Sequence, residues 1–321
     1  MIRSYQSGDE AAIVVLWNRA LPKDPITPFI FLKHVLTDPN FDPEGVLLAE
    51  IDGTIVGCVL AVVRKLPLAG VDLEPDDGWI TAFFVAPEAR RRHIAADLLQ
   101  AADDFFRRRG RKNVYFASYA PHYFLPGIDE TNYPAGKRAL ERAGYSVLYS
   151  PVAMDRNLVN YQYPDDVRAL EMKRQTEGYV VEPLSYSFVT QVIAFNQNVF
   201  NPDWARAVRE ALAQGAPLSR VLIARRHEQV VGFCTYGAYD GVLERFGPFG
   251  VAPELRGTGL GKVLLYRCME SMRADGLHGA WFLWTGEQSP AGRLYLRAGF
   301  AVTRRFDVMK KTLKERFEPV N

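Results

Sequence analysis

Two segments of the chain show the same order of apolar and polar positions. In the first, two apolar runs, Val46–Glu50 and Ile55–Val63, are separated by the turn pair Asp52-Gly53. Such a pair between apolar runs is typical of a β-hairpin. A similar run, Val221–Ala224, starts the second segment. We therefore predict an antiparallel hairpin in each half of the chain.

A further strand and an amphipathic helix follow each hairpin. The strands are predicted at Ile80–Val85 and Phe246–Val251, and each ends at Ala-Pro, where the proline cannot donate to a ladder. Apolar residues at steps of three and four then place a single apolar stripe on each helix. The stripes are formed by Ile94, Leu98, Leu99, Ala102, Phe105 and Phe106, and by Leu260, Val263, Leu264, Cys268 and Met272.

Each segment continues with a strand, a short helix and closing strands. The strands are predicted at Val114–Ser118 and Ala280–Thr285, and each short helix ends at Ala-Gly-aromatic, where glycine favours a left-handed helix stop. Strands around Ser146–Met154 and Ala301–Lys310 are expected to close the two units. The pattern predicts an α/β (α+β) protein with two mixed, mostly antiparallel central sheets flanked by helices.

The two segments also share residues, which indicates a duplication. Three matches occur in the same order, at offsets that fall from 175 to 155 residues. The matches join Val46–Gly57 to Val221–Gly232, Phe84–Arg90 to Gly250–Arg256, and Arg142–Tyr145 to Arg297–Phe300. We predict an N-terminal domain at 1–158, a polar linker at 159–177 and a C-terminal domain at 178–321.

The composition narrows the class of protein. A length of 321 residues fits two domains, and 48% hydrophobic with 24% charged residues excludes a disordered or collagen-like chain. A net charge of +2 does not suggest a nucleic-acid binder. Neither the three cysteines nor the five histidines show metal-ligand spacing, so no metal is expected. No apolar stretch approaches the roughly 20 residues of a membrane span, and the first ten residues lack the apolar core of a signal peptide. We expect a soluble, cytoplasmic protein, and its oligomeric state is not predicted.

A glycine-rich junction joins the second strand to its helix. Gly257, Gly259 and Gly261 are bracketed by Arg256 and Lys262. Glycines let the backbone approach a ligand closely, and amide groups at a helix N-terminus bind anions such as phosphates. The loop lacks the complete glycine pattern of a dinucleotide-binding fold and the Gly-Lys-Ser/Thr of a P-loop. By itself it is either an anion site or an ordinary glycine-rich turn.

With its flanking elements, this junction resembles the GNAT superfamily of acetyl-CoA-dependent N-acetyltransferases. The family pattern Arg/Gln-x-x-Gly-x-Gly/Ala is met by Arg256, Gly259 and Gly261. A second pattern, Asn-x-x-Ala-x-x-x-Tyr-x-x-x-Gly-Phe, is met by Ala291, Tyr295, Gly299 and Phe300, with Gln288 in place of the asparagine. The duplicated arrangement is similar to that of mycothiol synthases, and it implies two tandem GNAT folds.

The resemblance implies roles for particular residues. Phe249, Gly250 and Val251 would pair with the pantetheine arm and aim an N–H at the thioester carbonyl. Tyr295 would be the general acid toward the departing thiolate, or simply a packing residue on a helix face. The coenzyme A pyrophosphate would be held by Arg256, Gly257, Thr258, Gly259, Leu260, Gly261 and Lys262, with Gln288 also in the cofactor site.

The general base is less well marked. Many family members carry a glutamate six residues before the position of Val251, where this chain has Arg245. Glu244 is one residue away, and such a slip turns the side chain to the other face unless Gly247-Pro248 forms a bulge. Glu244 is the candidate base, with a water chain or another residue as the alternative.

The first copy departs from the same template. Arg90 and Ala95 are kept, but His93 replaces the central glycine and Leu140 stands where the second copy has Tyr295. Eleven extra residues lie around Tyr119–Pro134, as a packed surface loop or as a wall of the substrate cleft or domain interface. We expect a catalytically degenerate first domain that serves substrate binding or scaffolding.

These residues predict an enzyme. We expect the C-terminal domain to transfer the acetyl group of acetyl-CoA to a primary amine by direct attack. The partner would be a small-molecule or peptide amine, without nucleic acid, membrane or metal. The alternative is a non-catalytic acyl-CoA-binding sensor or interaction module.

Overall fold

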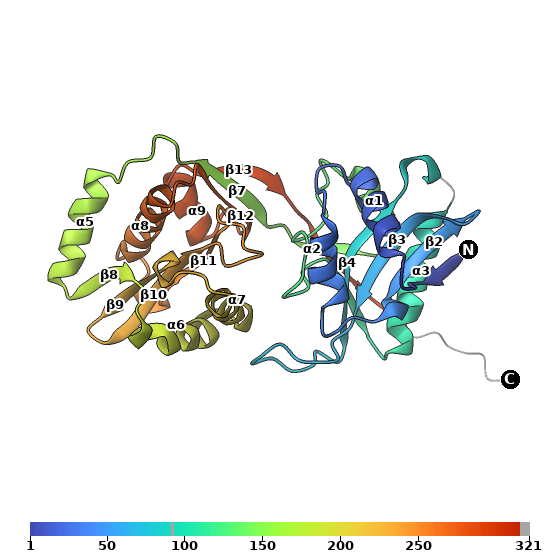
Figure 1. Ribbon diagram of the computed structural model, residues 1–321, viewed down its shortest axis with the longest axis horizontal. Coiled ribbons are helices and arrows are strands. Elements are labelled where there is room, and N and C mark those ends of the chain that lie inside the picture. Colours follow the sequence, from blue (N-terminus) through green and yellow to red (C-terminus); the bar gives the residue numbers. More distant parts are fainter. Residues whose placement is uncertain (91–92, 315–321) are drawn as a thin grey trace. The chain divides into compact units, whose positions relative to one another are not determined.

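The computed structural model describes residues 1–90 and 93–314 of the chain. It divides the chain into two compact units (Figure 1). The first unit contains residues 1–67, 71–151 and the end of the chain from 304, and the second contains 68–70 and 152–303. Within the described ranges, no helix has both the length and the apolarity needed to cross a bilayer.

The first unit contains a mixed sheet of seven strands. Neighbouring strands pair antiparallel, apart from β4 and β5, which pair parallel. The strand order is β1 (Ile2–Ser4), β2 (Val46–Ile51), β3 (Thr54–Val62), β4 (Asp77–Val85), β5 (Asn113–Phe116), β14 (Val308–Thr312) and β6 (Ser146–Tyr149). Strands β2 and β3 form the hairpin that the Asp52-Gly53 turn predicts.

Helices flank this sheet. The six apolar residues predicted to form one stripe on α3 are all buried in the core of the unit, which confirms that helix and its orientation. The principal helices are α1 (Glu10–Ala20), α2 (Pro28–Phe31), α3 (Ile94–Arg108) and α4 (Pro134–Arg142).

The second unit contains two sheets. One has the order β11 (Phe246–Val251), β10 (Gln229–Tyr236), β9 (Val221–Arg226), β8 (Tyr179–Pro183), and the other has the order β12 (Gly279–Thr285), β7 (Val152–Asn157), β13 (Ala301–Arg305). The five helices are α5 (Asp165–Thr176), α6 (Val189–Phe195), α7 (Pro202–Ala213), α8 (Leu260–Ala274) and α9 (Pro290–Arg297). The apolar stripe predicted on α8 is buried. Helix α5 occupies most of the segment predicted as a linker and packs on α8.

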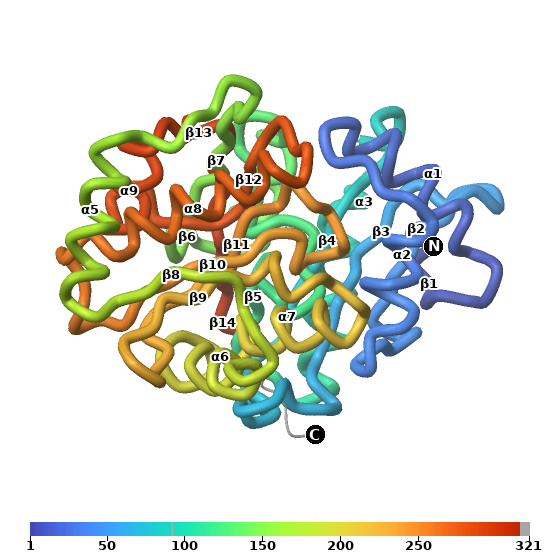
Figure 2. Tube along the Cα trace, turned by 60° about the vertical axis from the view of Figure 1, so that its left-hand side comes forward, coloured from blue at the N-terminus to red at the C-terminus, as the bar shows by residue number. Residues whose placement is uncertain are grey.

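The closing strand of each sheet comes from the other copy. Strand β14, labelled in Figure 2, lies between β5 and β6 of the first unit. Its residue Met309 pairs with both Phe116 and Val147. Strand β7, from the first copy, lies between β12 and β13 of the second unit. The expectation that each copy closes its own sheet is therefore wrong.

The exchange has a physical basis in the sequence. Met154 and Met309 hold matching places in the duplicated segments, and both are fully buried, so β7 and β14 present similar apolar faces to either gap. Only two residues separate β6 from β7, and one of them is Pro151. In place of a hairpin, the backbone N–H of Phe306 donates to the Pro151 carbonyl at 3.0 Å. The two connecting segments thus pair with each other.

Removing β14 tests this arrangement. A chain that ends at Arg305 keeps all of β13 but loses the strand between β5 and β6. Burying an apolar side chain contributes about 1.5–3 kcal/mol, so loss of Val308 and Met309 should lower the free energy of unfolding of the first unit by roughly 3 kcal/mol or more. Amide hydrogen exchange in β5 and β6 should become fast, although the deletion lies in the second copy. A chain that ends at Lys314 is the control, and unchanged protection of β5 and β6 after loss of β14 would contradict the exchange.

Candidate functional site

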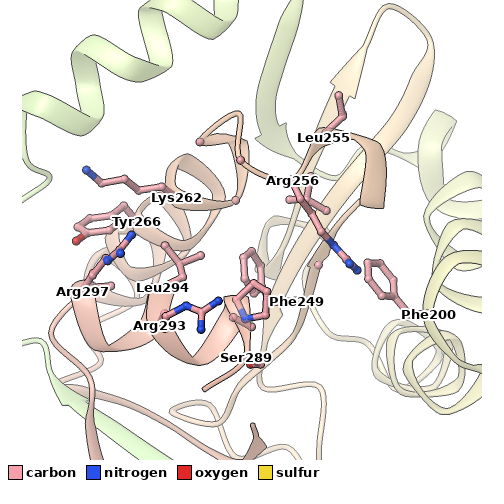
Figure 3. Close-up of a pocket in the computed structure, with 18 of the residues that line it drawn as sticks. Phe200, Phe249, Leu255, Arg256, Lys262, Tyr266, Ser289, Arg293, Leu294 and Arg297 are labelled. Carbon is pink, nitrogen blue, oxygen red and sulfur yellow. The ribbon is translucent and has the colours of Figure 1, made fainter. Parts of the chain in front are cut away.

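A cavity of about 900 Å³ opens in the second unit where β11 meets the start of α8 (Figure 3). Its walls come from the end of β11, the loop that follows, the first turns of α8, and α9. Phe200 and Trp204 line another side, with their ring centroids 4.8 Å apart. Most residues of the predicted glycine-rich junction therefore line this cavity.

Two glycines shape the loop. Gly257 and Gly259 have φ of +83° and +88°, a left-handed conformation that favours glycine. A Cβ added to Gly259 would lie 2.8 Å from Cδ2 of Leu170, on α5. Both the backbone conformation and the space at Gly259 therefore favour a residue without a side chain.

The same loop leaves the start of α8 open to a ligand. Gly259 is the N-cap, so no side chain caps the helix from that position. The hydroxyl of Thr258 accepts a hydrogen bond from the N–H of Leu260 at 3.4 Å, and it donates to the carbonyl of Leu255 at 2.7 Å. The N–H groups of Gly261 and Lys262 come next in the first turn, where helix amides favour an anion.

The charged side chains around the cavity also favour an anion. Four cations line it, Arg256, Lys262, Arg293 and Arg297, against one carboxylate, Asp166. Lys262 Nζ lies 2.6 Å from Asp166 Oδ2, and this ion pair lowers the pKa of the aspartate. Both side chains of the pair are partly exposed, so the pair leaves the lysine accessible to a bound anion. The charge of the lining therefore favours an anionic ligand over a cationic one.

The open edge of β11 forms the other functional part of the site. On one side β11 pairs with β10, and on the other it meets β12 through an isolated bridge between Arg245 and Trp281. Beyond that bridge the two sheets separate, and Phe249, Gly250 and Val251 line the cavity. Backbone groups at such an edge can pair with an extended ligand as a further strand would.

A bulge lies at Gly247-Pro248, as the sequence argument about Glu244 requires. Phe249 is opposite Cys234, whereas Phe246 is opposite Tyr236, so β11 has one extra residue between these pairs. As a result Phe246 and Phe249 lie on one face, with ring centroids 6.0 Å apart.

The residues before the bulge differ in their surroundings. Glu244 is half-buried, its backbone carbonyl accepts from the N–H of Trp281 at 3.0 Å, and it is not among the residues that line the cavity. Arg245 is buried, with its guanidinium 3.2 Å from Asp240 and over the ring of Tyr239. The assignment of Glu244 as a base stays a prediction.

Tyr295 is not among the residues that line the cavity. Its side chain is 7% exposed and packs on α9 against four phenylalanines, and its neighbour Leu294 lines the cavity instead. Burial raises the pKa of Tyr295 well above its usual value of 10, so the phenol keeps its proton at any physiological pH. The ring centroids of Phe246, Phe249, Phe282 and Phe300 lie 4.5 to 6.0 Å from that of Tyr295.

Of the predicted cofactor residues, the structure brings eight to the cavity: Phe249, Gly250, Val251, Arg256, Gly257, Gly259, Gly261 and Lys262. Thr258 and Leu260 support the loop from behind, and Gln288 accepts a hydrogen bond from Arg293 through its carbonyl at 2.6 Å. Sequence reasoning missed Arg293 and Arg297. Their spacing of four residues on a short helix was the available signal, because it places both side chains on one face.

The first unit has a cavity of about 970 Å³ at the equivalent place, lined by residues of α3 and α4. His93, the N-cap of α3, has φ 59° and ψ 0°, so it takes the left-handed conformation that Gly259 has in the second unit. Arg90, Arg138 and Arg142 line this cavity. Leu140 is fully buried and supplies no hydroxyl where Tyr295 stands in the second copy.

Comparison with known proteins identifies the fold. A model of the acetyltransferase (GNAT) family matches residues 14–123, and a model of the acetyltransferase (GNAT) domain matches residues 217–302. A comparison with curated proteins finds no match.

Solved structures resemble the whole chain. The GCN5-related glucosamine N-acetyltransferase region of a fungal multi-domain GH3 beta-N-acetylglucosaminidase has a TM-score of 0.80 at 18% identity, covering 97% of this chain and 38% of that one. A GCN5-related N-acetyltransferase from Sphaerobacter thermophilus has a TM-score of 0.67 at 16% identity, covering 98% and 96%. A tandem GNAT protein from the clavulanic acid biosynthesis pathway has a TM-score of 0.63 at 14% identity, covering 98% and 99%. Identities this low show a shared fold.

Proposed function

Because the chain belongs to the GNAT acetyltransferases and contains two domains of that family, we propose that its second unit transfers the acetyl group of acetyl-CoA to a primary amine. One observation carries the proposal. The open edge of β11, the glycine N-terminus of α8 and four cations meet in a single cavity. A phosphorylated carrier with an extended, amide-bearing arm matches all three.

The phosphates would bind at the α8 end of the cavity. Amides of Gly259, Gly261 and Lys262 would cradle the pyrophosphate, because helix N–H groups and the helix dipole both favour negative charge. Arg256 sits beside the loop, and Arg293 and Arg297 add positive charge from α9. The overall charge of the protein is only +2, so these local cations supply the attraction.

The acyl end would lie along β11. The edge of Phe249–Val251 would pair with the pantetheine arm and present an N–H to the thioester carbonyl. Pairing with β10 fixes this edge before the ligand arrives. A fixed donor stabilises the negative charge that develops on the carbonyl oxygen as the amine attacks.

Direct attack then needs two proton movements. The amine nitrogen forms a bond to the thioester carbon and loses a proton, and the C–S bond breaks as the thiolate leaves. Tyr295 is the candidate donor to that thiolate, because burial keeps its phenol protonated. Glu244 or a water chain would accept the proton of the amine. The acceptor would be a small-molecule or peptide amine that reaches the cavity past Phe200 and Trp204.

The alternative is a non-catalytic acyl-CoA-binding module. It is favoured by the positions of Tyr295 and Glu244 outside the lining of the cavity. Turnover separates the two functions, since both predict binding of acetyl-CoA.

An assay of thiol release from acetyl-CoA with a panel of primary amines tests the proposal. We expect turnover by the wild-type protein and a fall in kcat of about 100-fold in Tyr295→Phe, the scale of a lost general acid. The affinity for acetyl-CoA should be unchanged. Tyr186→Phe is the matched control, because that side chain is 87% exposed. Binding without turnover on any amine would favour the sensor, and an unchanged kcat would remove Tyr295 from the mechanism.

Replacing Gly259 with the residue that the first copy carries tests the phosphate site. In Gly259→His, the new Cβ meets Leu170 Cδ2 at 2.8 Å and the φ of +88° is strained, so the loop or the Leu170 side chain must move. We expect the Kd for acetyl-CoA, measured by calorimetry, to rise about tenfold or more. Gly276→His is the control, because Gly276 has a similar φ of +83° and no neighbour within 4 Å. Equal affinities in the two variants would place the phosphates elsewhere.

A further inference from the structure

The first unit contains a histidine paired with a buried carboxylate. His122 Nδ1 lies 2.7 Å from Asp38 Oδ2, and the side chains are 17% and 3% exposed. His122 belongs to the extra segment, around Tyr119–Pro134, that the second copy lacks. The pair therefore has no counterpart in the second unit.

A network of hydrogen bonds fixes the carboxylate. Asp38 Oδ1 accepts from the hydroxyl of Tyr119 at 3.2 Å and from the backbone N–H of Asn40 at 2.7 Å. The Asn40 amide in turn donates to the Tyr119 oxygen at 2.8 Å. Burial raises the pKa of Tyr119, so its hydroxyl remains a donor to Asp38. The charged neighbours are Arg64, whose guanidinium lies over the Tyr119 ring, and Glu74, which pairs with Arg64.

This arrangement determines which ring nitrogen of His122 is reactive. A carboxylate at Nδ1 keeps the proton on that atom, so the lone pair of the neutral imidazole lies on Nε2. The ring is partly exposed, and the ring of His34 stands beside it with centroids 5.3 Å apart. A base held in one tautomer by a third group is the general pattern for activation of a nucleophile.

The His122–Asp38 pair lies near the place where β4 and β5 of the first unit stop pairing. Pairing between β4 and β5 ends at Ile80 and Phe116. The ring of Tyr119, three residues beyond β5, lies 5.5 Å from that of Trp79 on β4. Val85, at the other end of β4, lines the cavity of the first unit. From Ile80 to Val85 the strand advances five residues, about 17 Å at 3.3 Å per residue. This stretch of β4 thus runs from the region of the His122–Asp38 pair to the cavity that three arginines line.

We propose that the first unit is a second acyl-transfer centre in which His122, positioned by Asp38, is the general base for an amine acceptor. The identity of the donor rests on the proposed function of the second unit. Nε2 takes a proton from the amine as its nitrogen bonds to the thioester carbon, and the C–S bond then breaks with its electron pair on sulfur. A thiol has an ordinary pKa near 8.5, so the thiolate leaves without a phenol donor, and the imidazolium returns its proton to the thiolate or to water. Leu140 in place of a tyrosine is compatible with this route, which is the alternative to the expected silent first domain.

The experiment uses the full chain with Tyr295→Phe as background, so that the second unit contributes little turnover. We expect residual thiol release that depends on an amine. Adding His122→Gln should lower it at least twofold, to the roughly 1% of wild-type turnover that the second unit keeps without its general acid. In His122→Gly, imidazole added to the buffer should restore part of the rate, which a merely structural role would not do. His278→Gln, at an exposed site, is the matched control.

Asp38→Asn tests the positioning residue. In the Tyr295→Phe background it should lower the residual kcat to the level of the His122→Gln variant with little change in KM for acetyl-CoA, and circular dichroism should show an intact fold in each variant. A residual rate that His122→Gln leaves unchanged, or no residual rate in the Tyr295→Phe background, would overturn the proposal while leaving the second unit as the active one. Transfer that depends on His122 but not on Tyr295 would instead refute the proposed function of the second unit. Absence of turnover in the wild-type protein would refute both.

Discussion

The exchanged strands are the constraint on which both units depend. A sheet with a missing central strand leaves a row of unpaired backbone groups and an uncovered core, and each copy fills that gap in the other. The consequence reaches the site of the second unit. Arg156, on the exchanged strand β7, donates to the carbonyl of Ala298 at the end of α9 and lies 3.3 Å from the sulfur of Met269. Since α9 carries Tyr295 and two of the cavity arginines, a residue from the first copy holds part of the second site.

The two units share a fold, but their cavities are lined by different residues. In the second unit, a glycine N-cap and an open strand edge line one cavity, and a buried tyrosine lies outside its lining. In the first, a histidine adopts the same left-handed cap, leucine replaces the tyrosine, and an inserted loop contributes a His–Asp pair. Both copies keep the left-handed N-cap conformation at the start of the long helix, while the side chains around it differ. If the proposal for His122 holds, the chain contains two related sites of different chemistry.

The sequence predicted the parts of the fold that local pattern controls. Apolar periodicity identified α3 and α8, and the repeat with its glycine motif identified the residues from Phe249 to Lys262 that line the cavity. The exchange of β7 and β14 could not be predicted, because equivalent apolar strands fit either gap equally well. Helix α5 was missed since its apolar pattern is weak, although its Leu170 covers Gly259. The contact between Asp38 and His122 joins residues 84 positions apart through a loop of irregular path, and no periodic pattern encodes such a contact.

The central claim is that acetyl-CoA binds the second unit along β11 and at the N-terminus of α8. Amide hydrogen exchange, followed by mass spectrometry with and without saturating acetyl-CoA, tests it most directly. The account predicts slower exchange across residues 246–262, because the ligand would accept hydrogen bonds from the open strand edge and from the first turn of the helix. Binding of acetyl-CoA with no slowing in that segment would contradict it.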